Sequence, residues 1–168
     1  YDASRQTIMI IDDDPSMLWF VTEIFAGKYN VQPFNSAQEA LEQLKLKQPD
    51  LILSDVMMPD MDGRAFAKIV KEDKLLSHIP LVLLSALNYI DEQVKGIESG
   101  AEAYVTKPFN VEYLEKIVER QIRRKEDMKE YYSSIYSAFK LEDGHLLHKE
   151  DKSFFEKMMR VIDEYVEN

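Results

Sequence analysis

Short apolar runs alternate with longer amphipathic stretches through most of this chain, and this alternation is the feature that most restricts its fold. Three of the runs are nearly continuous in apolar residues, which is typical of strands that helices cover on both faces of a parallel sheet. The alternation therefore predicts an α/β fold with a doubly wound (βα)5 parallel sheet. The predicted strands are residues 7–11, 30–34, 51–54, 81–84 and 103–106.

Residues that favour helix starts precede the amphipathic stretches. Pro15 suits the first turn of the first helix, and Ser36, Asn88 and Asn110 suit the caps of the second, fourth and fifth helices. Trp19 lies on the apolar face of the first helix, and we expect it to pack in the core. The first helix is expected to run from Pro15 to about Ala26, and the second from its cap at Ser36 to about Lys47. Residues 60–63 are expected to introduce the third, which continues to about Glu72.

The C-terminal quarter of the sequence has a different pattern. The fifth helix is expected to continue to about Tyr132, whereas the following residues lack sustained periodicity and include Gly144. We therefore expect an extended helix end and linker over residues 126–152, followed by another amphipathic helix over 153–168, which needs a partner because one helix cannot bury its own face. Residues 1–6 are expected to be a lead-in.

Charge and composition exclude several classes of protein. The 168 residues carry a formal net charge of -10 and no Cys, so these residues alone are not expected to bind DNA or to form disulfides or thiolate metal sites. No apolar run approaches the roughly 20 residues needed to span a bilayer, so we expect no membrane contact and a cytoplasmic location. Because the sequence begins at Tyr1, without a Met or a signal-peptide pattern, we expect a fragment of a longer chain.

Polar residues follow the predicted strands at their carboxyl ends. Since these ends meet at one edge of a parallel sheet, we expect the side chains to lie together. Carboxylates held in one crevice need a cation, and Mg²⁺ suits hard oxygen ligands with room for water, with Mn²⁺ as an alternative ion. The residues are Asp12, Asp13 and Asp14 after the first strand, Asp55 after the third, Ser85 after the fourth and Lys107 after the fifth.

This combination of groups is suited to phosphoryl transfer. With a cation bound, a carboxylate oxygen of Asp55 can attack phosphorus and form an aspartyl phosphate. Lys107 would supply positive charge for the transferred oxygens, and Ser85 would donate a hydrogen bond to one of them. Positioning and charge neutralisation do most of the work in such reactions.

Four blocks of the sequence resemble the receiver domains of two-component response regulators: "IIDDDP", "DLILSDVMMPDMDG", "VLLSA" and "AYVTKPF". The resemblance covers about residues 7–124, and we place a receiver domain at 7–125. It implies a flavodoxin-like three-layer sandwich with strand order 2-1-3-4-5 and a helical C-terminal extension.

Matched by position, the resemblance assigns a role to each residue of the strand ends. Asp55 becomes the phosphoacceptor for a histidine kinase, Asp12 and Asp13 bind Mg²⁺ with Asp55 and the main-chain carbonyl of Met57, and Ser85 and Lys107 contact the phosphoryl group. Tyr104 stands at the aromatic position that turns inward on activation, Asp14 has a supporting role, and the Lys107–Pro108 bond is expected to be cis. The implied activity is limited to the domain's own phosphorylation and dephosphorylation.

The last 20 residues or so resemble the opening helix of an AraC-type DNA-binding domain. This second resemblance implies a hybrid two-component regulator, in which sensor, histidine kinase, receiver and DNA-binding effector share one polypeptide. Phosphorylation is then expected to bias a surface of the fourth helix, fifth strand and fifth helix, through which the chain would form a homodimer or reposition its tail.

Two alternatives come from other classes of protein. A phosphatase of the haloacid dehalogenase type shares the doubly wound topology and Mg²⁺, but it expects an acid-x-acid nucleophile motif after the first strand. A vestigial receiver that acts only as an interaction module is expected to have lost one of the five key positions. For Tyr104 a half-buried strand aromatic is the simpler interpretation, and the Met and His residues are interpreted as core, loop or surface residues and not as ligands.

Overall fold

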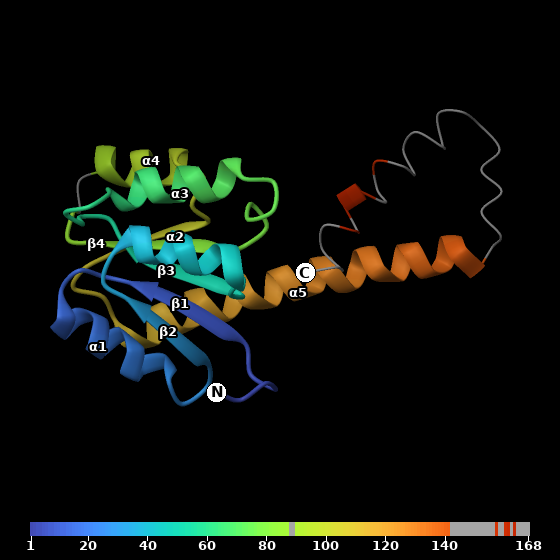
Figure 1. Cartoon of the computed structure of the whole chain (residues 1–168), viewed down its shortest axis with the longest axis horizontal. Helices are drawn as coiled ribbons and strands as arrows, with labels where there is room; N and C mark the ends of the chain where they lie inside the picture. Colours follow the sequence, from blue (N-terminus) through green and yellow to red (C-terminus); the bar gives the residue numbers. More distant parts are fainter. Residues whose placement is uncertain (88–89, 142–156, 158–159, 162, 164–168) are drawn as a thin grey trace. The chain divides into compact units, whose positions relative to one another are not determined.

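Five parallel strands form one sheet in the order β2-β1-β3-β4-β5, which confirms the predicted topology (Figure 1). The structure is a computed structural model that describes residues 1–87, 90–141, 157, 160, 161 and 163. The strands are β1 (Thr7–Ile11), β2 (Asn30–Phe34), β3 (Leu51–Asp55), β4 (Leu81–Ser85) and β5 (Ala103–Thr106).

The strands β1, β3 and β4 are buried along their whole length. This burial agrees with their nearly continuous apolar sequences, because helices cover both faces of the sheet at its centre. β3 and β4 each extend one residue further than the apolar pattern predicts, so Asp55 and Ser85 are the last residues of their strands. Both side chains are therefore held by the sheet itself.

The helices begin close to the predicted positions. Asp14 caps α1 by accepting a hydrogen bond from the Ser16 amide, and Ser36 caps α2 in the same way through the Glu39 amide. Asn110 accepts from the Tyr113 amide at the start of α5, whereas Asn88 lies outside the described residues. The helices are α1 (Pro15–Phe25), α2 (Ala37–Leu46), α3 (Gly63–Glu72), α4 (Ile90–Glu98) and α5 (Val111–Leu141).

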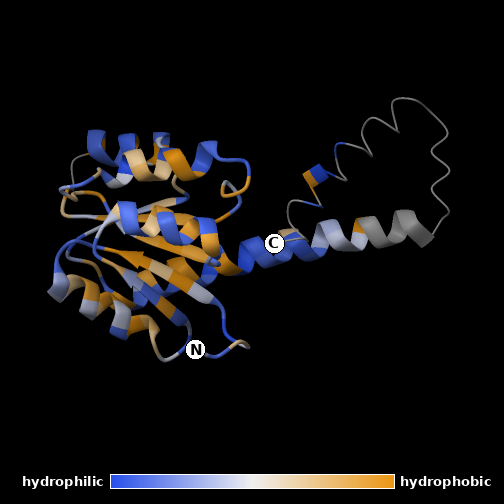
Figure 2. Ribbon diagram, viewed as in Figure 1, coloured by the Kyte–Doolittle hydropathy of each residue, from blue (hydrophilic) through white to orange (hydrophobic). Residues whose placement is uncertain are grey.

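Two apolar layers, one on each face of the sheet, form the core. α2 and α3 pack on one face with residues such as Leu44 and Phe66, and α1 and α5 pack on the other with residues such as Phe25 and Val118. Figure 2 shows the resulting pattern, with hydrophobic strands in the centre and many hydrophilic residues on α2, α3 and α4. This is the expected three-layer sandwich. Among the described residues, no helix combines the length and apolar character that a membrane span needs.

The prediction for Trp19 was wrong, because its side chain is 65% exposed. Residues 17–21 of α1 are all apolar, so the sequence does not reveal which side of the helix faces the sheet. The buried side is marked by Val21 and Phe25. At 100° per residue, Trp19 lies about 200° around the helix from Val21 and therefore points outward.

α5 continues to Leu141, so residues 133–141 are helical where the sequence analysis expected a linker. These residues contain neither Gly nor Pro, and a helix that is already formed adds each further residue at little cost. The chain divides into two units, residues 1–122 and residues 123–168. Most of the predicted linker, and most of residues 153–168 that resemble an AraC-type helix, lie outside the described residues.

Candidate functional site

Three carboxylates meet at the carboxyl edge of the sheet. Asp12 directly follows β1, Asp55 ends β3, and these two strands are hydrogen-bonded neighbours with Ile11 beside Ser54. Asp12, Asp13 and Asp55 each offer a carboxylate oxygen, and the three oxygens lie within 4.8 Å of one another. The structure thus brings together the acids that the sequence analysis placed at this edge.

Burial makes this concentration of negative charge unfavourable. Asp12 and Asp55 are 3% and 8% exposed, whereas Asp13 is exposed to solvent. Burial, with a smaller contribution from the charge of Asp12, raises the pKa of Asp55 above its ordinary value. The ammonium group of Lys107 opposes this rise, since its Nζ lies 2.9 Å from Asp12 Oδ2 and 3.3 Å from Asp55 Oδ1.

The three acids fit a divalent cation with oxygen ligands. Mg²⁺ binds oxygen at about 2.1 Å, so ligands on opposite sides of the ion lie about 4.2 Å apart. The spacing of the three carboxylate oxygens is close to this range, and the solvent exposure of Asp13 leaves room for the waters that Mg²⁺ usually keeps. Asp12, Asp13 and Asp55 would hold the ion, which would neutralise their charge.

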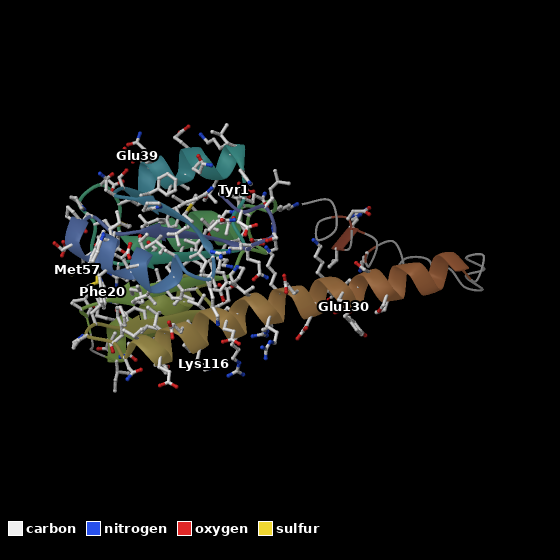
Figure 3. All side chains as sticks on the ribbon, turned by 90° about the horizontal axis from the view of Figure 1, so that it is seen from below. Tyr1, Phe20, Glu39, Met57, Lys116 and Glu130 are labelled. Atoms are coloured by element: carbon white, nitrogen blue, oxygen red, sulfur yellow. The ribbon has the colours of Figure 1, made fainter. Side chains whose placement is uncertain are left out.

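Met57, whose main-chain carbonyl is the further expected ligand, lies in the loop between β3 and α3, two residues after Asp55. Its side chain is 60% exposed, and Figure 3 labels it at the outer edge of the part that holds the sheet. The role of its carbonyl stays a prediction.

A chain of hydrogen bonds links Ser85 to Tyr104. The Leu87 amide donates to Ser85 Oγ over 3.0 Å, and the Tyr104 hydroxyl donates to the Leu87 carbonyl oxygen over 2.9 Å. Ser85 is fully buried, and the half-buried Tyr104 ring packs against the core on the α2 and α3 side. In this structure the ring is therefore turned toward the core, and its hydroxyl group contacts the loop that follows Ser85.

Lys107 is positioned by its own main chain. Its amide donates to the Ser85 carbonyl oxygen over 2.7 Å, which ties the residue after β5 to the end of β4. The Lys107–Pro108 bond is cis, as the resemblance implied. Asp12 is oriented in turn by the Asp14 amide, which donates to Asp12 Oδ1 over 2.9 Å. Because the Asp14 side chain caps α1, this residue supports the site without joining the acidic cluster.

Two sets of contacts at the start of α3 were not predicted from the sequence. Gly63 begins α3 and lies against the backbone of Asp55, and its amide donates to the Val56 carbonyl oxygen over 2.7 Å. Arg64 forms ion pairs with Asp62 and with Glu92 of α4. The Asp-Gly pair at residues 62–63 signals a turn, but only the folded chain shows what the glycine contacts.

Gly63→Ala is expected to destabilise the fold and disturb Asp55. A Cβ at this position would lie 2.0 Å from the Asp55 carbonyl oxygen and 2.9 Å from Val56 Cα, so backbone must move. We expect a loss of about 1–3 kcal/mol in the free energy of unfolding, measured by urea denaturation. Gly27→Ala is the matched control, since its Cβ would meet nothing within 4 Å. Equal stability of the Gly63 and Gly27 variants would contradict this interpretation.

Residues 8–119 match the family model of the response regulator receiver domain. The chain is 35% identical to the DNA-binding response regulator MtrA of Mycolicibacterium smegmatis over 75% of this chain and 54% of that protein. It is 34% identical to histidine kinase P4 of Formosa agariphila over 74% of this chain and 9% of that protein. The chain thus spans about half, or less, of the length of these relatives.

Among solved structures, the chain is similar to the BeF3-activated receiver domain of DrrB. The TM-score is 0.66 at 31% sequence identity, and the match covers 71% of this chain and 98% of that one.

Proposed function

The chain belongs to the response regulator receiver domain family, and we propose that it accepts a phosphoryl group on Asp55 from a histidine kinase. The observation that carries the proposal is the cluster of Asp12, Asp13 and Asp55, which Lys107 joins at the carboxyl edge of the sheet. Mg²⁺, or Mn²⁺ in its place, would be bound by these three acids and the Met57 carbonyl oxygen.

The proposed reaction moves a phosphoryl group from nitrogen to oxygen. A carboxylate oxygen of Asp55 attacks the phosphorus of a phosphohistidine, the P–N bond breaks, and the imidazole leaves with the electron pair and takes up a proton. A metal ion held by Asp12, Asp13 and Asp55 would supply charge neutralisation for the phosphoryl oxygens. Lys107, whose Nζ lies 3.3 Å from Asp55 Oδ1, would stabilise the same oxygens.

Ser85 and Tyr104 are proposed to report the phosphoryl group to the surface. The buried Ser85 hydroxyl would donate to a phosphoryl oxygen, and the loop at Leu87 and the Tyr104 ring would follow it. The two-state element is then the Tyr104 ring with the loop between β4 and α4. The hydrogen bonds from Leu87 to Ser85 and from Tyr104 to Leu87 support this connection.

A small phosphodonor tests the proposed function without a kinase. With acetyl phosphate and Mg²⁺, the chain is expected to gain the mass of one phosphoryl group, and to gain none when a chelator removes Mg²⁺. Steady hydrolysis of a phosphomonoester would contradict the proposal in favour of a haloacid-dehalogenase-type phosphatase. Inertness toward several phosphodonors would favour a vestigial receiver that acts only as an interaction module.

Dimerisation through α4, β5 and α5 is the output proposed for the domain itself. Ile90, Val94 and Ile97 are 77%, 47% and 50% exposed, and their spacing places them along one side of α4. Burial of this apolar stripe against a second copy would hold a homodimer. Sedimentation of the phosphorylated chain is expected to show dimers that Val94→Asp prevents, and a phosphorylated monomer at high concentration would contradict this output.

We further propose that the parent protein is a cytoplasmic hybrid regulator with an AraC-type DNA-binding domain that begins with residues 153–168. One similar protein is a histidine kinase and another is a DNA-binding response regulator, and in each the matching segment is only a part of the chain. The proposal rests on the sequence resemblance of those last residues. A parent sequence without a double helix-turn-helix domain would contradict it.

A further inference from the structure

We propose that Gly96 of α4 leaves the space that the inward Tyr104 ring occupies. Gly96 is thereby a positioning residue of the proposed switch that Ser85 and Tyr104 form. The inference rests on the proposed function, because it concerns how the response to phosphorylation is set. Gly96 is buried in α4, and the Tyr104 ring occupies the space where any other residue would have its Cβ. A side chain at position 96 and the inward ring therefore exclude each other.

The distances leave no room for even a methyl group. A Cβ built at Gly96 would lie 2.3 Å from Tyr104 Cδ2 and 2.7 Å from Tyr104 Cε2, far inside van der Waals contact. The backbone does not otherwise call for glycine, because Gly96 has no positive φ and lies inside a helix, where glycine is less favourable than alanine. Close approach of the ring accounts for the glycine.

The ring that Gly96 accommodates is the one that contacts the loop after Ser85. Its hydroxyl group donates to the Leu87 carbonyl oxygen, and the Leu87 amide donates to Ser85 Oγ. A ring displaced from Gly96 would lose the hydrogen bond to Leu87. A side chain at position 96 would thus disturb the hydrogen bonds that lead from Tyr104 to Ser85. In the proposed function, the Ser85 hydroxyl group donates to the phosphoryl group.

An ion pair connects α4 to α3 near Gly96, so we expect the ring to move and not the helix. Glu92, one turn before Gly96, forms an ion pair with Arg64 at the start of α3, and Arg64 is also paired with Asp62. Both Arg64 and Glu92 are only about a quarter exposed, at 25% and 24%. Tyr104, in contrast, needs only side-chain rotation to leave its position.

The test compares Gly96→Ala with Gly27→Ala, a glycine whose Cβ would meet nothing within 4 Å. The probe is beryllofluoride with Mg²⁺, a mimic of the phosphoryl group, and its affinity is measured by calorimetry. Because coupling between two sites is reciprocal, a variant that disfavours the inward ring should bind the mimic less tightly, by about fivefold or more. Gly27→Ala should bind as the parent chain does. Equal affinity of Gly96→Ala and the parent would overturn the proposal.

A double-mutant cycle separates this steric effect from general damage to α4. In a Tyr104→Ala background the ring is absent, so Gly96→Ala should cause no further loss of affinity. An equal loss in both backgrounds would overturn the proposal. If Gly96→Ala alone fails to fold, the double variant should fold, and a double variant that also fails to fold would contradict the account.

The position of the ring distinguishes failure of this inference from failure of the proposed function. A parent chain that does not bind beryllofluoride contradicts the proposed function. The inference is still tested by the NMR contacts of the Tyr104 ring, which should include Gly96 in the parent and be lost in Gly96→Ala. Ring contacts that are unchanged in the variant would overturn the inference whatever the outcome of the binding experiment.

Discussion

Asp55→Asn is expected to reduce phosphoryl uptake from a small phosphodonor to the background of a chain incubated without it. The amide of asparagine lacks the carboxylate oxygen that we propose attacks phosphorus, and we propose that the neighbouring Asp12 and Asp13 bind the metal ion. The fold should persist, because the substitution is isosteric and removes a buried group whose ionisation is unfavourable there. Intact-mass spectrometry after incubation with acetyl phosphate and Mg²⁺ measures the effect.

Asp73→Asn is the matched control for this prediction. Asp73 is exposed just after α3, and its Oδ1 accepts a hydrogen bond from the Leu75 amide, a bond that asparagine can keep. This variant should be phosphorylated as rapidly as the parent. Phosphoryl uptake by Asp55→Asn at the parent's rate would show that another residue is the acceptor.

The double variant Asp12→Asn, Asp13→Asn is expected to lose Mg²⁺ binding and, with it, phosphorylation. It removes two of the three carboxylates of the cluster and leaves Asp55 beside Lys107. Loss of even an outer partner of a metal ligand typically costs 10–100-fold in affinity, so we expect a loss of more than about a hundredfold here. Calorimetric titration with Mg²⁺ measures it.

Asp14→Asn provides a control with the same change of chemistry at the adjacent position. Its side chain caps α1 through the Ser16 amide, and asparagine is an equally good cap. Mg²⁺ affinity should therefore change by less than about threefold in this variant. If Asp14→Asn weakens Mg²⁺ binding as strongly as the double variant does, the division of the three acids is wrong.

The pH dependence of the site follows from the raised pKa of Asp55. Protons compete with Mg²⁺ for this carboxylate, so Mg²⁺ affinity should be full above the raised pKa and should fall as the pH drops through it. This fall should occur at a pH above 3.8, the ordinary pKa of an aspartate side chain. Without Mg²⁺ the stability trend is opposite. Protonated Asp55 favours the folded state, and this contribution is lost as the pH rises through the raised pKa. Asp55→Asn should remove the part of both dependences that Asp55 contributes.

Much of the fold could be predicted because burial of apolar side chains determines both the sequence pattern and the packing of the elements. The runs that became β1, β3 and β4 are continuous in apolar residues because both faces of each strand are buried. Helix starts were visible because their caps are local, as at Ser36 and Asn110. Residues 17–21 are all apolar, so the pattern did not show which side of the first helix is buried. The prediction for Trp19 was wrong for this reason.

The residues that meet at the candidate site could be predicted, but the close approaches of the backbone and side chains around it could not. Parallel strands bring their carboxyl ends to one edge, so the meeting of Asp12, Asp55 and Lys107 followed from the order of the elements. The close approaches at Gly63 and Gly96 depend on how α3 and α4 sit against the sheet. No local sequence pattern specifies such distances, and for this reason the two glycines became visible only in the structure.

Direct identification of the phosphorylated residue tests the central claim most closely. Hydride reduction of an aspartyl phosphate leaves a homoserine, which marks the acceptor for peptide mass spectrometry after incubation with acetyl phosphate and Mg²⁺. We expect the mark at Asp55, and we expect it to be absent when Mg²⁺ is chelated. A mark at Asp12 or Asp13 instead, or a stable phosphoryl group on a hydroxyl side chain, would contradict the claim.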